Sequence, residues 1–129
     1  MPILGHGIDL VETSRIERML SDHPDRFIER CFTVRESEDS QGARRIEHLA
    51  ARFAAKEAAL KALGTGWSRG IGWTDVAVVR AESGRPSLLV TGRAREIADE
   101  IGIDSWHVSL THTESHASAS VIAEGVAKE

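Results

Sequence analysis

The sequence lacks what a disulfide-rich, membrane-spanning or strongly basic protein would carry. A single cysteine, Cys31, excludes a disulfide bond within the chain. No apolar run approaches the roughly 20 residues of a membrane-spanning helix, and the start, MPILGHGIDL, has no basic region typical of a signal peptide. The formal net charge of -4 gives the whole molecule no field that favours nucleic acid or anionic membranes. We therefore expect a soluble cytoplasmic protein that binds neither nucleic acid nor membrane.

The length and the hydrophobic content of the chain are those of one globular domain. Aromatic residues are few and tyrosine is absent, but hydrophobic residues make up 41% of the 129 residues, enough for a normal core. The length is that of a single domain, and the chain shows no repeat, low-complexity tract or internal boundary. We predict one domain over residues 1–129.

Periodicity predicts short elements arranged around one long helix. Strands are expected at 3–11, 73–81, 87–90, 106–113 and 115–123, and helical segments at 12–20, 25–32, 44–63 and 92–102. Residues 33–36 have capping-box spacing, and residues 37–42 read as a polar link. Together, these elements predict an α+β fold with a small antiparallel sheet, one long helix and shorter helices. A doubly wound nucleotide-binding fold is disfavoured because strands and helices do not alternate regularly.

The long helix carries a carboxylate and an amine, Glu57 and Lys61, one turn apart among small residues. Its apolar stripe and its alanines cover most of the circumference, which indicates burial on several sides. Arg52 and Lys56 form a second pair on the other side of the stripe. An exposed pair of this spacing is an ordinary surface feature worth a few tenths of a kcal/mol. The neighbouring alanines, however, would let another chain segment or a ligand approach Glu57.

Asp9, in GHGIDLVE, has two interpretations. Taken alone, it is best explained as the N-cap of the helix that follows. Alternatively, Asp9 pairs with Glu57 to bind Mg²⁺, which takes one or two protein carboxylates and completes its shell with water and substrate phosphates. Lys61 would then contact the same phosphates.

The glycine-rich segment GTGWSRGIG resembles a phosphate-binding loop in composition but has the wrong polarity. A P-loop precedes its helix, so that N–H groups and the positive end of the dipole face the phosphate. This segment follows the long helix, and Gly64 is expected to end that helix in the left-handed conformation. The glycines still leave room for a flat ligand close to the backbone.

The histidines near the end do not have the pattern of a zinc site. In an extended strand, His107, Ser109 and Thr111 share one face and His112 lies on the other. His116 belongs to the next strand or the turn, and no cysteine or HExxH motif accompanies them. The first three side chains suit hydrogen bonding to a phosphate, or simply a solvated sheet face.

The first helical region is locally basic, although the whole chain is acidic. Five arginines fall within about twenty residues: Arg15, Arg18, Arg26, Arg30 and Arg35. One interpretation is a solvated face with internal ion pairs to Glu17, Asp22 and Glu29. The other is a docking surface for an acidic partner helix, in which arginine steers and Met19 packs. Cys31 is expected to be a small core residue.

Three stretches occur in a characteristic order: GIDLVE, RFAAKEAALKALGTG, and HVSLTHT followed by ASASVI. With GIGWTDVAVV and GRPSLLVTGRA between them, they resemble the family of holo-acyl carrier protein synthases, the small 4′-phosphopantetheinyl transferases of fatty acid biosynthesis. The resemblance covers nearly the whole chain. Each motif is moderately specific, and the ordered set is much more so.

The resemblance implies the fold and reaction of that family. Its members move the 4′-phosphopantetheine group of coenzyme A to a serine of apo-acyl carrier protein, release adenosine 3′,5′-bisphosphate and require Mg²⁺. Members of this size are homotrimers with active sites between subunits.

The resemblance also implies residue roles. Asp9 and Glu57 would be the metal ligands and, with Lys61, the catalytic groups. The coenzyme A contacts would be Arg52, Lys61, Gly64, His107 and Thr111. The carrier-protein docking positions would be Arg15, Met19, Arg26 and Phe27.

Several points stay open from the sequence. Phosphoryl-group transfer depends mainly on positioning and charge neutralisation, but the serine proton can pass to Glu57, to a metal-bound water beside Asp9 or to bulk water. One alternative function is a transferase that serves polyketide or peptide synthase carriers. Another is a trimeric coenzyme A- or nucleotide-binding module without turnover, which would not need Asp9, Glu57 and Lys61 together.

Overall fold

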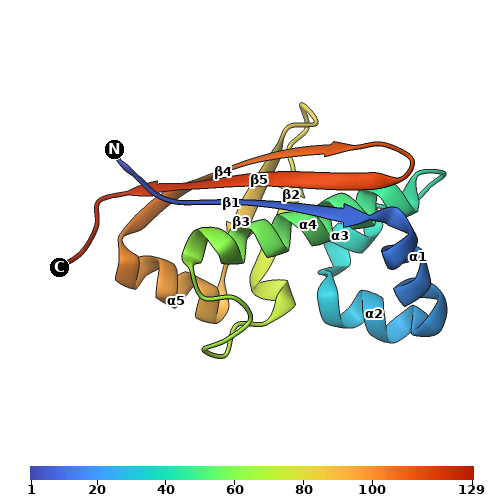
Figure 1. Cartoon of the computed structure of the whole chain (residues 1–129), viewed down its shortest axis with the longest axis horizontal. Helices are drawn as coiled ribbons and strands as arrows, with labels where there is room; N and C mark the ends of the chain where they lie inside the picture. Colours follow the sequence, from blue (N-terminus) through green and yellow to red (C-terminus); the bar gives the residue numbers. More distant parts are fainter.

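The computed structural model describes all 129 residues and has the predicted α+β architecture. The elements are β1 (Ile3–Glu12), α1 (Thr13–Asp22), α2 (Pro24–Cys31), α3 (Val34–Asp39), α4 (Arg45–Leu63), the 3₁₀ turn η1 (Trp73–Asp75), β2 (Val76–Arg80), β3 (Pro86–Val90), α5 (Gly92–Ile101), β4 (Ile103–His112) and β5 (His116–Gly125). An antiparallel sheet of order β1–β5–β4 runs along one side, the β2–β3 hairpin crosses it, and the helices gather beneath (Figure 1).

Helix α4 is the centre of the molecule. Its apolar stripe and all seven of its alanines are buried, and the helix packs against β1 and β5. The helix ends at Gly64, whose φ of 78° is left-handed, and the Gly64 N–H donates to the carbonyl of Leu60. The predicted helix and its glycine stop are therefore confirmed. No helix of the structure has the length and apolar character that a membrane crossing requires.

Strand β1 lies unusually close to α4. A Cβ atom on Gly5 would fall 2.0 Å from the carbonyl oxygen of Ala62, and one on Gly7 would fall 1.9 Å from that of Ala58. Glycine is required at both positions because any side chain would collide with the helix backbone. The small residues of α4 therefore admit another chain segment, β1, which approaches the helix at Ala58 and Ala62.

Three predicted boundaries are wrong by three residues each, one of them at β4, which begins at Ile103 and not at 106. Residues 37–42 were expected to be a polar link, but α3 continues to Asp39 because the capping box at Thr33 and Glu36 nucleates a short helix. Residues 73–75 form the turn η1 before the strand begins at Val76. The hairpin, the last helix and the two final strands are confirmed.

The interpretation of Asp9 as a helix N-cap is also wrong. Helix α1 begins at Thr13, its N-cap residue is Glu12, and no side chain caps it. Asp9 instead lies inside β1, where its backbone pairs with Ala119 of β5. Its carboxylate is therefore free for another role.

Candidate active site

Asp9 and Lys61 meet where β1 crosses α4. Gly5, Gly7 and Asp9 share one face of β1, since alternate residues of a strand point the same way, and the close packing of the glycines brings this face onto the helix. The Lys61 ammonium donates to Asp9 Oδ1 at 3.1 Å and to the carbonyl oxygen of Ile8 at 2.9 Å. The Asp9 carbonyl accepts the Ser118 hydroxyl at 2.9 Å, which helps fix the strand at this point.

Glu57 lies one turn before Lys61 on the same side of α4 and is partly buried. Its carboxylate makes no hydrogen bond or ion pair within the chain. The Glu57–Lys61 surface pair considered from the sequence is absent, because Lys61 turns to Asp9 instead. Glu57 and Lys61 thus project from one side of α4, and Lys61 reaches Asp9 of β1; we call this region the β1–α4 seam.

The seam has the donor chemistry of a magnesium site rather than a zinc site. No three histidine, cysteine, aspartate or glutamate side chains converge at a point in this structure. Two carboxylates, one of them without any partner in the chain, match the small number of protein ligands that Mg²⁺ takes when phosphates and water complete its shell. The residues present at the seam therefore fit Mg²⁺.

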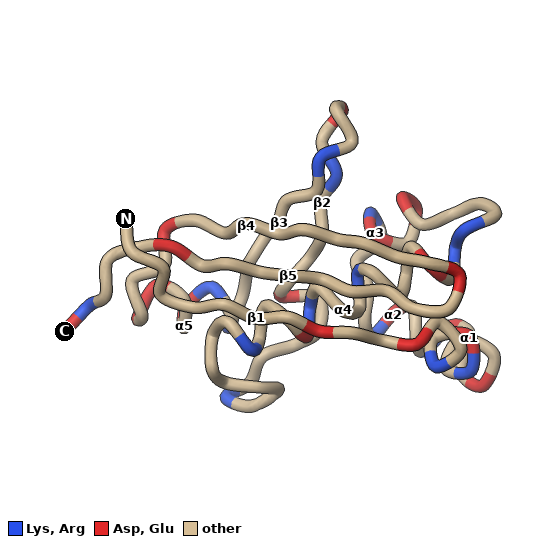
Figure 2. The backbone as a smooth tube through the Cα atoms, turned by 45° about the horizontal axis from the view of Figure 1, so that its top comes forward, with Lys and Arg blue, Asp and Glu red and all other residues tan.

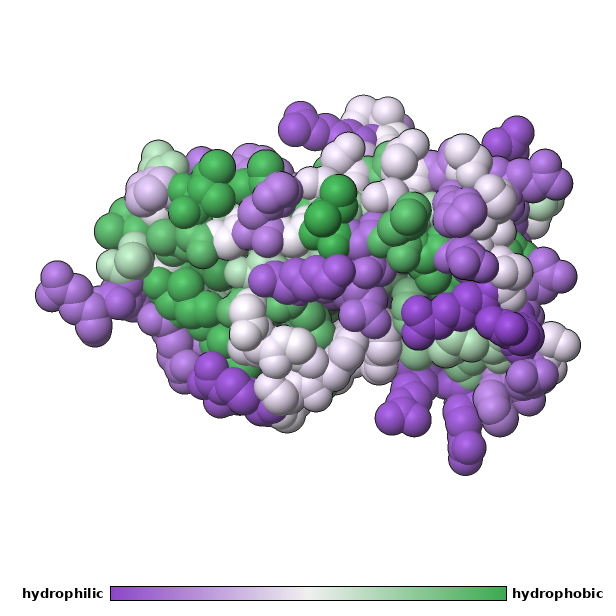
Figure 3. Space-filling view, viewed as in Figure 1, coloured by the Kyte–Doolittle hydropathy of each residue, from purple (hydrophilic) through white to green (hydrophobic).

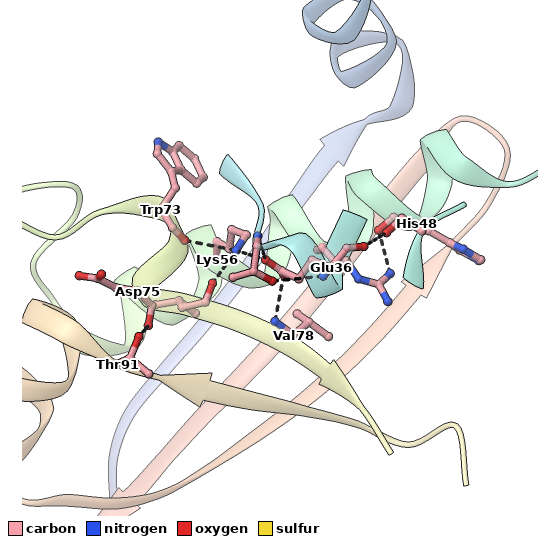
Figure 4. A network of polar contacts seen from close by, with 11 residues as sticks. Glu36, His48, Lys56, Trp73, Asp75, Val78 and Thr91 are labelled. Atoms are coloured by element: carbon pink, nitrogen blue, oxygen red, sulfur yellow. Dashed lines mark hydrogen bonds and ion pairs between the residues drawn. The ribbon is translucent and has the colours of Figure 1, made fainter. Parts of the chain in front are cut away.

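The other side of α4 carries a second lysine–carboxylate pair, fully buried. The Lys56 ammonium donates to Glu36 Oε1 at 2.7 Å and to the carbonyl oxygens of Val76 and Trp73 at 2.5 and 3.2 Å (Figure 4). The second carboxylate oxygen of Glu36 accepts the Val78 N–H at 3.0 Å. Burial lowers the pKa of Lys56, and the neighbouring Glu36 opposes that shift. This network ties α3, α4 and β2 together, and nothing in the sequence patterns predicted it.

Arg52 shares this buried side and does not reach the β1–α4 seam. It is 1% exposed, and its Nη1 donates to the His48 carbonyl at 3.3 Å. Its Nε and Nη2 atoms have no hydrogen-bond partner. Burial lowers the pKa of Arg52, with a further contribution from the nearby charge of Arg80. Within one chain, the predicted phosphate contact therefore lies apart from Asp9.

His107 and Thr111 lie on the outer face of the sheet, turned away from α4. Cross-strand pairing places His107 beside Ile122, which pairs with His6, and Thr111 beside Ser118, which pairs with Leu10. The predicted strand parity is confirmed, because His107, Ser109 and Thr111 are exposed together while His112 points inward. His107 is hydrogen-bonded to Glu124 across the strands.

The inward-facing His112 meets His48 of α4, with ring centroids 5.6 Å apart. Burial, and secondarily the charge of Arg52, lowers the pKa of His48. These two histidines thus belong to the packed side of α4 and not to the face that carries His107.

Gly64 stands beside Lys61 but offers no free N–H. That group donates to the carbonyls of Leu60 and Lys61, as a helix-ending residue does. Gly64 can still provide open space for a ligand, because no atom lies within 4 Å of the position that a Cβ would take there.

Three of the four predicted docking residues, Met19, Arg26 and Phe27, line a pocket between α1, α2 and η1. The pocket has a volume of about 190 Å³ and is lined by Met19, His23, Arg26, Phe27, Arg30, Cys31 and Trp73. Met19 and Arg26 reach the surface, whereas Phe27 is buried and forms the floor. Arg15 lies over the Phe53 ring, 5.3 Å from its centroid. No internal ion pairs to Glu17, Asp22 or Glu29 form.

Sequence reasoning missed the role of Trp73 in this pocket. Its ring stacks on Phe53, with centroids 4.8 Å apart, although it lies twenty residues further along the chain. Only the tertiary structure brings η1 beside α2. Cys31 is a buried core residue, as expected, and burial raises the pKa of its thiol.

Comparison with known proteins identifies the family. The model of the 4′-phosphopantetheinyl transferase superfamily matches residues 5–120. The chain belongs to that superfamily. The holo-[acyl-carrier-protein] synthase of Streptomyces avermitilis is 49% identical over 126 residues, which cover 97% of this chain and 100% of that protein. The resemblance described from the motifs is confirmed.

Solved structures of the family share the fold. The crystal structure of holo-[acyl-carrier-protein] synthase from Neisseria meningitidis has a TM-score of 0.87 and 31% identity, covering 95% of this chain and 99% of that one. The enzyme from Bacillus anthracis, in complex with CoA (3′,5′-ADP), has a TM-score of 0.77 and 35% identity, covering 96% and 98%. The predicted α+β transferase fold is therefore confirmed.

Proposed function

We propose that this chain is a holo-[acyl-carrier-protein] synthase. It transfers the 4′-phosphopantetheine group of coenzyme A to a serine of apo-acyl carrier protein, releases adenosine 3′,5′-bisphosphate and so serves fatty acid biosynthesis. The observation that carries the proposal is the contact of Lys61 with Asp9, with Glu57 one turn away on the same side of α4, in a chain of this superfamily. We propose a cytoplasmic location for this reaction.

The residues of the seam have the properties that the transfer needs. The serine oxygen forms a bond to the phosphorus that carries pantetheine, and the bond from that phosphorus to the bridging oxygen breaks, so negative charge develops on the departing bisphosphate. Lys61, an exposed ammonium on a flexible stem, neutralises that charge when it contacts the pyrophosphate. Asp9 and Glu57 supply the carboxylate oxygens that hold the cation.

Mg²⁺ bound at the seam would neutralise phosphate charge and help align the phosphates with the attacking serine. The protein's own contribution is positional. Asp9 is fixed in a three-stranded sheet and Glu57 in a buried helix, so both carboxylates project from rigid elements. The serine proton passes to Glu57 or to water at this site.

The basic pocket between α1 and α2 is the proposed docking site for the carrier protein. Arg15 and Arg18 lie on α1 and Arg26 and Arg30 on α2, and α1 directly follows the acidic second half of β1 (Figure 2). Arg15 and Arg26 are exposed, and Met19 lines the apolar pocket together with Arg26. This combination attracts an acidic partner and gives its apolar side chains a place to pack.

We further propose that the complete site forms between copies of the chain in a homotrimer. Asp9 and Lys61 lie on the helix side of the sheet, whereas His107 and Thr111 lie on its outer face, with β5 between their strands. One chain therefore cannot bring all four to one ligand. The outer face also exposes Ile8 and Leu10 by 60% and 66%, and hydrophobic patches run along this part of the surface (Figure 3). A second copy would cover them.

The transfer itself is tested by mass. The protein is incubated with coenzyme A, Mg²⁺ and apo-acyl carrier protein, and the intact mass of the carrier is followed. We expect a gain of one phosphopantetheine group, lost when EDTA removes the metal. Coenzyme A binding without a mass gain on any carrier would favour a non-catalytic binding module. A gain only on polyketide or peptide synthase carriers would assign the chain to those pathways instead.

The shared site is tested by mixing. Asp9→Asn and His107→Ala variants are each expected to be inactive as single species. Co-expressed, they should recover part of the activity, because one class of interface then carries both native residues. If a mixed trimer of confirmed composition showed no activity, Asp9 and His107 would have to act in a site formed by one chain.

A further inference from the structure

The Lys61 ammonium contacts the Asp9 carboxylate, which is one of the two proposed ligands of the cation. It contacts Asp9 Oδ1 at 3.1 Å and is held in position by the Ile8 carbonyl oxygen at 2.9 Å. A bound divalent cation requires the same carboxylate, and a carboxylate oxygen that accepts an ammonium hydrogen bond is poorly available as a ligand. Lys61 and the cation therefore compete.

The contact is weak enough to be exchanged. The Lys61 side chain is 54% exposed and that of Asp9 is 19% exposed. Exposed ion pairs of this type contribute at most about 1 kcal/mol, so a cation of modest affinity suffices to replace the ammonium. The other lysine of α4, Lys56, is the opposite case, since it is fully buried and has three acceptors.

We propose that Lys61 is an internal counter-ion, which neutralises Asp9 in the metal-free protein and is displaced when a divalent cation binds. The proposal rests on the metal assignment made under the proposed function. Displacement frees the ammonium at the moment when the seam acquires its cation. The Asp9 carboxylate is then no longer available to Lys61, and the flexible Lys61 side chain can contact an incoming phosphate.

This exchange couples the two halves of the site. A phosphate group that holds Lys61 away from Asp9 assists cation binding, and a bound cation assists phosphate binding by the same factor, as linkage requires. The site then assembles in a concerted way around metal and substrate. The cation alone and the phosphate alone each bind more weakly than when the other is present.

The test measures cation binding without turnover. Mn²⁺, a spectroscopic substitute for Mg²⁺, is titrated into the full chain in the absence of coenzyme A and followed by electron paramagnetic resonance. Lys61→Met removes the ammonium and keeps most of the stem. We expect it to bind Mn²⁺ about two- to fivefold more tightly than the wild type, the fold-change equivalent to an exposed ion pair. Lys128→Met removes the same charge near the chain end and should leave the affinity unchanged.

A second measurement separates contact from through-space charge. The chain has three lysines, Lys56, Lys61 and Lys128, so its ¹⁵N side-chain ammonium spectrum at low temperature contains at most three signals, and the variants assign them. Diamagnetic Mg²⁺ should shift the Lys61 signal towards that of a solvated ammonium and abolish its hydrogen-bond couplings. The Lys56 signal should not move.

The outcomes distinguish this proposal from the proposed function. Equal Mn²⁺ affinity in the wild type and Lys61→Met, or a Lys61 signal that Mg²⁺ leaves in place, would overturn the exchange and leave the transferase intact. If neither protein bound Mn²⁺, with or without coenzyme A, the metal assignment itself would fail and the exchange with it. Thermal unfolding of each variant confirms that a folded protein was titrated.

Discussion

Helix α4 carries two lysines, five residues apart, and each forms an ion pair with a carboxylate. The two pairs differ in how far solvent reaches them. Lys56 contacts Glu36 where both side chains are fully buried. Lys61 contacts Asp9 where the lysine is half exposed and the aspartate is partly so. The distances, 2.7 and 3.1 Å, are similar. Solvent therefore distinguishes the pairs more than geometry does: the first cannot open without exposing a buried charge, and the second can exchange its partner.

Additional hydrogen bonds stabilise the buried Lys56–Glu36 pair. Lys56 also binds two backbone carbonyls, and Glu36 also accepts two backbone N–H groups, from Thr33 and Val78. Such full satisfaction offsets the large desolvation cost of burying two charges. At the β1–α4 seam, by contrast, Glu57 has no partner within the chain, as a residue that binds a ligand requires.

The largest expected effect is on the buried pair. Lys56→Met leaves the Glu36 carboxylate buried without a counter-charge, and removal of one partner of such a pair costs about 3–5 kcal/mol. We expect a loss of that size in the free energy of unfolding, measured by urea denaturation monitored by circular dichroism.

A double variant shows whether the unpaired charge is responsible. Glu36→Gln added to Lys56→Met removes the charge and keeps one amide oxygen for a backbone N–H, so it should recover part of the lost stability. A double variant less stable than Lys56→Met would show that the carboxylate stabilises α3 and β2 independently of Lys56.

The next effect is on the unpaired carboxylate of the seam. Glu57→Gln removes a negative charge and weakens a metal ligand, so carrier modification should fall by about a hundredfold or more. The unfolding free energy should change little, because Glu57 makes no polar contact in the fold. Single-turnover transfer to apo-acyl carrier protein measures the rate. Glu96→Gln, on the exposed face of α5, is the matched control and should retain full activity; full activity of Glu57→Gln would refute the metal assignment.

The smallest effect concerns the exposed lysine. Lys61→Met breaks an ion pair that solvent screens, so the unfolding free energy should fall by less than about 1 kcal/mol. The measurement is the same urea titration as for Lys56→Met, which makes the two lysines of α4 directly comparable. A loss as large as that of Lys56→Met would end the distinction between a fixed and an exchangeable pair. Transfer activity should nevertheless fall strongly, because the ammonium acts on the substrate.

The local pattern of the chain predicted most of the fold. The long α4 and its stop at Gly64, the β2–β3 hairpin and the alternation that separates His107 from His112 all depend on contacts between residues near in sequence. The error at the candidate site occurred where a distant partner decides. Asp9 has the sequence context of an N-cap, but its strand continues to Glu12 because β5 supplies hydrogen bonds along that length.

The sequence by itself determined the family, the order of the elements and the residue types at the seam, because ordered motifs and periodicity are local properties. Only the tertiary structure decided which lysine joins which carboxylate. Lys56 and Glu57 are neighbours in sequence, but the 100° turn between adjacent residues of a helix directs one to the interior and the other to the β1–α4 seam. The glycines of β1 then let Asp9 approach close enough for Lys61 to reach it.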